Sequence, residues 1–81
     1  MKISIEYCMQ WNYEPTAFSL RDELMDKFLG ESDSFEVELI EAGGGVFEVT
    51  VNDSLIFSKK ELDRFPNENE ISELVERFGL I

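Results

Sequence analysis

Residues 2–7 read KISIEY, and this stretch decides the fold because it alternates strictly between apolar and polar side chains. Ile3, Ile5 and Tyr7 fall on one side of the alternation. A period of two with β-branched residues predicts a half-buried strand. The alternation breaks at residues 8–14, CMQWNYE, which predicts a loop after this strand.

A helix and a second strand follow the loop. Pro15 suits the first position of a helix, where its missing N–H costs nothing. Over residues 15–29, apolar side chains recur at helical spacing, at Ala17, Leu20, Leu24 and Phe28. Residues 35–40, FEVELI, alternate again and predict a second strand. A strand, a helix and a strand in this order predict a parallel pair of strands.

Two more strands are predicted at residues 46–51, VFEVTV, and 54–58, SLIFS. Asn52 and Asp53 separate them, and both residue types tolerate a positive φ. Two such residues between alternating runs are typical of a tight hairpin turn. The sequence therefore predicts that these strands form an antiparallel hairpin.

The register of this hairpin stays open. A slip of one residue exchanges Ile56 with Leu55 and Phe57 between the two faces of the sheet. If Leu55 and Phe57 lie on the open face, they form an apolar patch that favours a homodimer. Before the hairpin, the triple glycine at 43–45 lacks the lysine and hydroxyl residue of a P-loop. It predicts a tight turn between adjacent strands.

The last part of the chain predicts a charged connection and a second helix. Residues 59–66, KKELDRFP, form the connection. Asn67 and Glu70 have the spacing of a capping box at a helix start. The helix has one apolar stripe, made of Ile71, Leu74, Val75 and Phe78, and Gly79 follows it.

The order β-α-β-β-β-α predicts one α/β domain over residues 1–81. Each helix has one apolar stripe, and the strands alternate instead of being apolar throughout, so only one face of the sheet is covered. We expect two layers: a four-stranded mixed sheet with both helices on one face. The other face is either merely solvated or an acidic docking surface, and it holds Lys2, Ser4, Glu6, Glu36, Glu38, Glu48 and Thr50.

The composition excludes several functional classes. The 81 residues include 18 carboxylates and seven Lys or Arg, for a net charge of -11. Such a charge repels nucleic acid and anionic membranes, and no basic cluster exceeds Lys59-Lys60. With one cysteine and no histidine, an intrachain disulfide, a zinc site and a histidine-dependent triad lack their residues. We expect no metal and no cofactor.

The expected location is the cytoplasm. The first residues lack the uninterrupted apolar core of a signal peptide. No apolar run approaches the ~18 residues that a membrane span needs.

Cys8 is the candidate catalytic residue. It follows the first strand, and ligands usually bind at the carboxyl ends of parallel strands. A nearby helix N-terminus favours thiolate over thiol. The alternative is an inert, buried cysteine that packs as a small apolar residue.

Four separate segments of this chain resemble the selenoprotein W-like proteins, the Rdx group of the selenoprotein W/T/H family. They are IEYC at 5–8, GGGVFEV at 43–49, LIFSK at 55–59 and FP at 65–66. The segments occur in the family's order, and the match as a whole covers nearly the whole chain. The resemblance implies a thioredoxin-like fold and thiol-based redox activity.

The redox motif of that family is Cys-x-x-Cys or Cys-x-x-selenocysteine. Here it reads Cys8-Met9-Gln10-Trp11, so Trp11 stands at the second redox position. The resemblance therefore implies a monothiol oxidoreductase, in which glutathione, a partner protein or a second copy supplies the other thiol. The alternative is a non-catalytic interaction module that keeps the fold and the binding loop without redox turnover.

Large side chains surround Cys8 in the sequence. We expect Met9, Gln10, Trp11 and Tyr13 to shape recognition of a partner, since Trp, Tyr and Met are enriched at the centres of interfaces. Any one of them can instead pack against the first helix.

Overall fold

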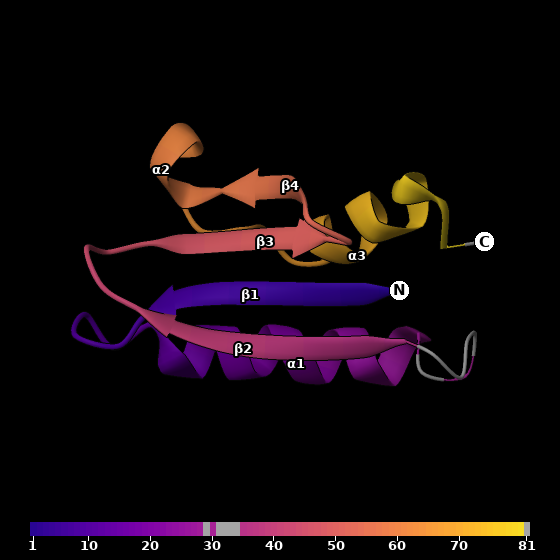
Figure 1. The fold of residues 1–81 in the computed structure, drawn as a ribbon, viewed down its shortest axis with the longest axis horizontal. Coiled ribbons are helices and arrows are strands. Elements are labelled where there is room, and N and C mark those ends of the chain that lie inside the picture. The colour runs from indigo at the N-terminus through magenta and orange to yellow at the C-terminus, as the bar shows by residue number, and fades with distance from the viewer. Residues whose placement is uncertain (29, 31–34, 81) are drawn as a thin grey trace.

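A computed structural model describes residues 1–28, 30 and 35–80 of the chain (Figure 1). The elements are β1 (Lys2–Cys8), α1 (Glu14–Phe28), β2 (Glu36–Ala42), β3 (Phe47–Val51), β4 (Ser54–Ser58), α2 (Lys59–Leu62), α3 (Glu70–Val75) and the π-helical turn η2 (Glu76–Leu80). The first helix is predicted over residues 15–29, and Leu29 lies outside the described residues.

The four strands form one mixed sheet in the order β2-β1-β3-β4. β1 pairs in parallel with β2, and its other edge pairs antiparallel with β3. β3 and β4 form the antiparallel hairpin, and φ is positive at both turn residues, Asn52 and Asp53. The predicted parallel pair and the predicted hairpin are both confirmed.

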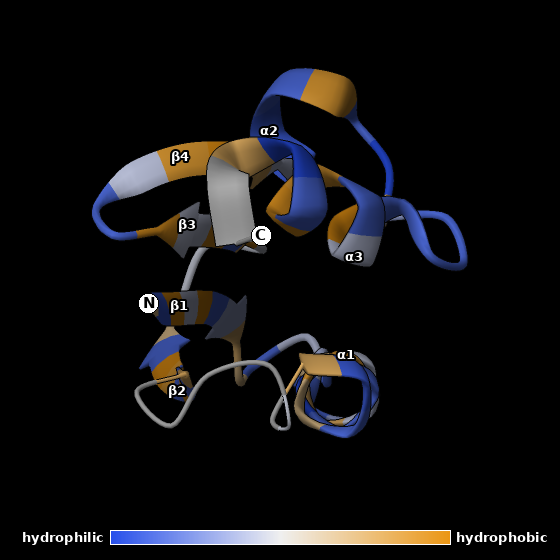
Figure 2. Cartoon of the chain, turned by 90° about the vertical axis from the view of Figure 1, so that its right-hand side faces the viewer, coloured by the Kyte–Doolittle hydropathy of each residue, from blue (hydrophilic) through white to orange (hydrophobic). Residues whose placement is uncertain are grey.

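The helices cover one face of this sheet, as the sequence predicts. Figure 2 shows α1 and α3 on the same side of the four strands. The core lies between these two layers. Its buried residues include Ile3, Ile5, Tyr7, Phe47, Val49 and Val51 from the sheet, and Ala17, Leu20, Leu24, Phe28, Ile71 and Val75 from the helices.

A β-bulge settles the open register of β4. Thr50 pairs with Leu55, whereas Val49 pairs with Phe57, so Ile56 is the extra residue. The bulge places Leu55 on the open face, 51% exposed, and Phe57 in the core, 2% exposed. The register that would give an apolar patch of Leu55 and Phe57 therefore does not occur, because only Leu55 lies on the open face.

Residues 59–66 are not only a charged connection, because the first four form the helix α2. Ser58 caps this helix: its hydroxyl accepts a hydrogen bond from the Glu61 N–H at 3.2 Å. Ser58 and Glu61 have the spacing of a capping box, which is the signal that reveals α2 in the sequence.

The start of the last helix also differs from the prediction. α3 begins at Glu70, after Asn69 in the left-handed region, so Asn67 is not its N-cap residue. One half of the predicted capping box is nevertheless present, because the Glu70 carboxylate accepts a hydrogen bond from the Asn67 N–H. At the other end, helical backbone continues through η2 to Leu80 and does not end before Gly79. Phe78, expected in the apolar stripe, is exposed.

Among the described residues, no helix combines the length and the apolar character that crossing a bilayer requires.

One ion pair fixes the segment before α3. The Arg64 guanidinium donates hydrogen bonds to both carboxylate oxygens of Glu70, at 2.7 and 2.9 Å. The Asn67 N–H donates to the same carboxylate at 2.8 Å. These bonds, chiefly that from Arg64, lower the pKa of Glu70 from 4.5 to about 2. The pair thus joins the chain before α3 to the first turn of the helix.

Glu70→Gln is expected to lower the free energy of unfolding by ~1–2 kcal/mol at pH 7, because a charge-assisted pair is lost. The lowered pKa in the folded state means that this contribution is present above pH 4.5 and disappears as the pH falls toward 2. Urea unfolding from pH 7 to pH 2 measures it. The control is Glu73→Gln, which removes an exposed charge from the same helix. Equal losses in the two variants at pH 7 would contradict the prediction.

Candidate functional site

The carboxyl end of β1 is closed by the connection between β2 and β3. The Cys8 N–H donates to the Val46 carbonyl at 3.0 Å, and the Met9 N–H donates to the Ala42 carbonyl at 3.1 Å. The connection therefore passes around the end of β1, with φ of 71° at Gly44 and 73° at Gly45. Gly44 and Gly45 do form the predicted turn, but the prediction that it joins adjacent strands is wrong, because β1 lies between β2 and β3 in the sheet.

Cys8 lies where the sequence places it, as the last residue of β1, but its side chain is fully buried, with 0% exposed. It is a free cysteine outside the main apolar cluster of the core. Its carbonyl accepts a hydrogen bond from the Tyr13 N–H at 3.2 Å. A thiol buried in this way does not meet a disulfide without a movement of the surrounding chain.

The loop after Cys8 presents three of the four predicted binding residues to solvent. Met9, Gln10 and Trp11 are exposed, Met9 by 41% and Trp11 by 60%. The Asn12 N–H donates to the Met9 carbonyl at 3.2 Å and closes the turn. Two large apolar side chains in solvent at one loop are typical of a binding surface.

Tyr13 is only partly exposed and packs against the core. Its ring meets the edge of Phe65 at 4.7 Å between centroids and lies 6.2 Å from the Trp11 ring. The structure therefore brings Trp11 and Tyr13 together. Tyr13 lies between the core and the loop and forms little of the exposed surface of the loop.

The Trp11 ring lies over Gly45. A methyl group added at Gly45 would overlap the ring and approach its Cε3 atom at 2.7 Å. An added methyl at Gly44 would meet no atom within 4 Å. Trp11 can therefore pack against the β2–β3 connection only because residue 45 is a glycine.

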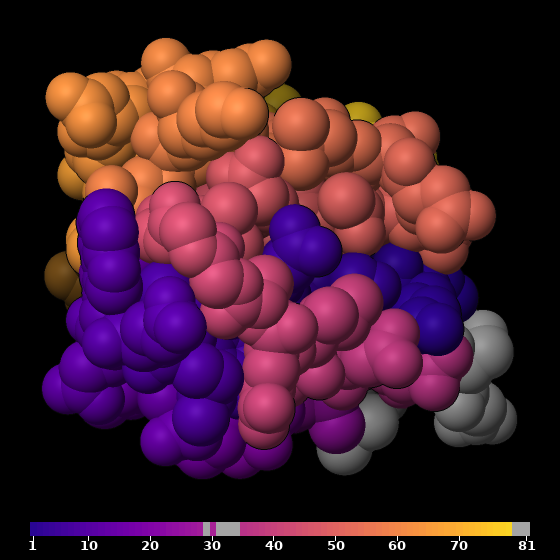
Figure 3. Space-filling model, turned by 60° about the vertical axis from the view of Figure 1, so that its left-hand side comes forward, coloured from indigo at the N-terminus to yellow at the C-terminus, as the bar shows by residue number. Residues whose placement is uncertain are grey.

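α2 completes a groove next to this contact. The groove has a volume of about 510 Å³ and is lined by Trp11, Gly44, Gly45, Val46, Lys59, Lys60 and Asp63. The segment after β1, the β2–β3 connection and α2 meet on one side of the molecule in Figure 3. Cys8 adjoins the groove through its hydrogen bond to Val46.

Lys59 and Lys60 are functional candidates that the sequence analysis noted only as a basic pair. The Lys59 ammonium lies 5.6 Å from the centre of the Tyr13 ring and 5.4 Å from that of Phe65. Such cation–π contacts hold the side chain in place. The capping box at Ser58 predicts a helix here, but only the order of the strands brings that helix to Trp11.

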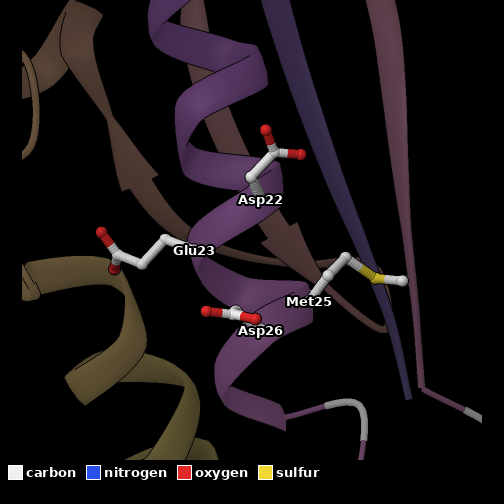
Figure 4. Close-up of a pocket in the computed structure, with 4 residues that line it drawn as sticks. All are labelled: Asp22, Glu23, Met25 and Asp26. Carbon is white, nitrogen blue, oxygen red and sulfur yellow. The ribbon is translucent and has the colours of Figure 1, made fainter.

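A second depression lies on α1 and is acidic. Asp22, Glu23, Met25 and Asp26 line it, and Glu23 and Met25 leave the helix on opposite sides (Figure 4). The described residues that line it include no basic and no nucleophilic side chain. Across the described ranges, no three carboxylate or cysteine side chains are placed to hold a metal ion. The groove at Trp11 is the better candidate site, since it combines a flat aromatic wall, two ammonium groups and the neighbouring Cys8.

Gly45→Ala and Gly44→Ala test the contact between Trp11 and the glycine connection. Both substitutions put a side chain on a residue with positive φ, which costs ~1–2 kcal/mol. Only Gly45→Ala also displaces the Trp11 ring, which adds ~1 kcal/mol or more of overpacking. We expect the larger loss of stability and a shift of the tryptophan emission in Gly45→Ala alone. Identical stability and emission in the two variants would contradict this packing.

Comparisons with known proteins show which family this chain belongs to. A model described as the Rdx family matches residues 2–77. Migration and invasion enhancer 1 of Bos taurus is 32% identical over 77 residues, which are 95% of this chain and 64% of that protein. The protein of that name from Mus musculus is 33% identical over 75 residues, which are 93% of this chain and 62% of the mouse protein. The chain thus spans less than two thirds of the length of these relatives.

Solved structures match over nearly the whole chain. A protein from Bordetella parapertussis has a TM-score of 0.87 and 26% identity, with 95% of both chains covered. A selenoprotein W-related protein from Vibrio cholerae has a TM-score of 0.85 and 28% identity, with 95% of this chain and 94% of that chain covered. The fold is thus the thioredoxin-like fold that the resemblance implied. On the match over residues 2–77, this chain belongs to the Rdx family.

Proposed function

We propose that this Rdx-family chain acts through Cys8 as a single redox thiol, which forms a mixed disulfide with glutathione or a partner protein. The observation that carries the proposal is the position of Cys8. Cys8 is the last residue of β1 and occupies the family's first redox position. Its N–H donates a hydrogen bond to the carbonyl of Val46, which lines the groove. A cytoplasmic location, where the glutathione pool keeps thiols reduced, suits this chemistry.

The exchange has two steps. The Cys8 thiolate attacks one sulfur of a disulfide R–S–S–R; that S–S bond breaks, a Cys8–S–S–R bond forms, and R–S⁻ leaves and takes up a proton. A second thiolate, R′–S⁻, then attacks the R sulfur and releases Cys8 and R–S–S–R′. Because Trp11 stands where the resolving residue of the family lies, R′–S⁻ comes from glutathione, another protein or a second copy of the chain.

The burial of Cys8 sets a condition on the first step. With no exposed surface on its side chain, Cys8 reacts only when the loop after β1 or the β2–β3 connection moves away. In the described residues, backbone hydrogen bonds such as Met9 N–H to Ala42 and Tyr13 N–H to Cys8 hold that region closed. We therefore expect Cys8 to react more slowly in the folded protein than in the unfolded chain.

The same burial favours a second candidate function. A non-catalytic interaction module needs the exposed Met9 and Trp11 and the groove, but it does not need an accessible thiol. In this case Cys8 is a small apolar residue that fills the end of β1. The two functions differ in whether Cys8 reacts while the protein is folded.

Intact-mass measurement separates them. The folded protein is incubated with oxidised glutathione and, separately, with a maleimide, at several pH values. The monothiol function predicts one glutathione adduct per chain that reduced glutathione removes, and maleimide labelling that is slower than in urea yet goes to completion. Cys8→Ser is the control and should gain no mass. A folded chain that stays unmodified, while the urea-unfolded chain labels fully, would overturn the monothiol function and support the interaction module.

A further inference from the structure

The groove at Trp11 has a charge opposite to that of the molecule. The whole chain has 18 carboxylates against seven Lys or Arg, but the lining of the groove has Lys59 and Lys60 against the single carboxylate of Asp63. The Debye length at physiological salt is about 8 Å, so the more distant carboxylates are largely screened from a ligand in the groove. The two nearby ammonium groups therefore dominate its electrostatics.

These ammonium groups are available to a ligand. Three other basic residues are engaged in ion pairs: Lys2 with Glu38, Arg21 with Asp22 and Arg64 with Glu70. In the part of the chain that the structure describes, neither Lys59 nor Lys60 has a carboxylate within 4.0 Å. Lys59 rests on aromatic rings instead of on an acid.

The shape of the groove fits a small ligand. Its volume of about 510 Å³ falls within the range of small-molecule sites in proteins, roughly 300–1,000 Å³. The exposed face of Trp11 offers apolar contact, and the backbone at Gly44, next to the Gly45 that the ring covers, has no side chain over it. A short peptide can contact the ring and both lysines at once, whereas a long polyanion would also meet the acidic surface beyond the groove.

We infer that this groove binds short peptides that carry carboxylates, with Lys59 and Lys60 as the residues that select them. The inference rests on the proposed function in that it names the class of thiol compound that reaches Cys8, an acidic peptide of the glutathione kind. Its test does not depend on the reactivity of Cys8, because binding is measured with a ligand that has no thiol.

Trp11 is the only tryptophan of the chain, so its fluorescence reports directly on the groove. The probe is S-methylglutathione, which has two carboxylates and no free thiol; the comparison ligand is its dimethyl ester, which has none. Titration at pH 7 and physiological ionic strength, where the more distant carboxylates are screened, is expected to give a saturable change of emission. Binding of the ester should be about 3–10-fold weaker, the range that one or two exposed ion pairs give.

Charge-matched variants locate the effect. The double variant Lys59→Gln, Lys60→Gln should bind S-methylglutathione about 3–10-fold more weakly than the wild type. The control double variant Lys2→Gln, Lys27→Gln changes the net charge by the same two units outside the groove and should leave the affinity unchanged. Asp63→Asn removes the one carboxylate of the lining and should tighten binding. Asn retains the left-handed conformation of that residue, which has φ of 57°.

The inference is overturned if the wild type does not bind S-methylglutathione, if the ester binds equally well, or if the two double variants lose affinity equally. Lys59 also contacts the Tyr13 ring, so the single variant Lys60→Gln, at an exposed residue, repeats the test without disturbing that packing. Failure of the proposed function gives a different result. In that case oxidised glutathione adds no mass to the folded chain, while S-methylglutathione still binds and Cys8→Ser binds it as the wild type does.

Discussion

β1 is the strand on which the rest of the molecule depends, because it is hydrogen-bonded along both edges. Its parallel pairing with β2 positions α1 against the sheet, and its antiparallel pairing with β3 positions the hairpin and, through it, α2. The odd-numbered side chains Ile3 and Ile5 of this strand are fully buried in the core. A change in the register of β1 would move these side chains to the open face and displace the elements on both sides.

The same central position explains why the site lies at the end of β1. Since β2 and β3 flank this strand, the connection between them has to pass around its carboxyl end, where Cys8 and Met9 donate to the carbonyls of Val46 and Ala42. That path brings the glycines under Trp11 and buries Cys8. The strand order therefore brings two distant segments into contact. One is the loop that carries the family's redox position at Cys8, and the other is the glycine turn that begins at Gly43, 35 residues later in the sequence.

The sequence predicted the elements well where a local pattern was strong. Alternation located the strands around Ile5 and Val49, and helical spacing located α1. It was wrong about which strands the glycine turn joins, and it left open the register of β4 and the burial of Cys8. All three depend on pairing at long range, that is, on which strands lie side by side. The break in the alternation located the loop that carries Met9 and Trp11, and both side chains are exposed there. The lysines of α2 could not be placed beside Trp11, because nothing in the local sequence shows the order β2-β1-β3-β4.

The bulge in β4 has a consequence for self-association. An open sheet has two edge strands whose free backbone groups can pair with another molecule, and natural proteins protect such edges. Here β4 is short and its regular ladder is broken at Ile56, while the other edge, β2, presents the exposed carboxylates of Glu36, Glu38 and Glu41. The bulge disfavours pairing at the β4 edge, and charge repulsion disfavours it at the β2 edge. Both edges therefore oppose the pairing of strands between two copies of the chain, which is the first step of sheet aggregation.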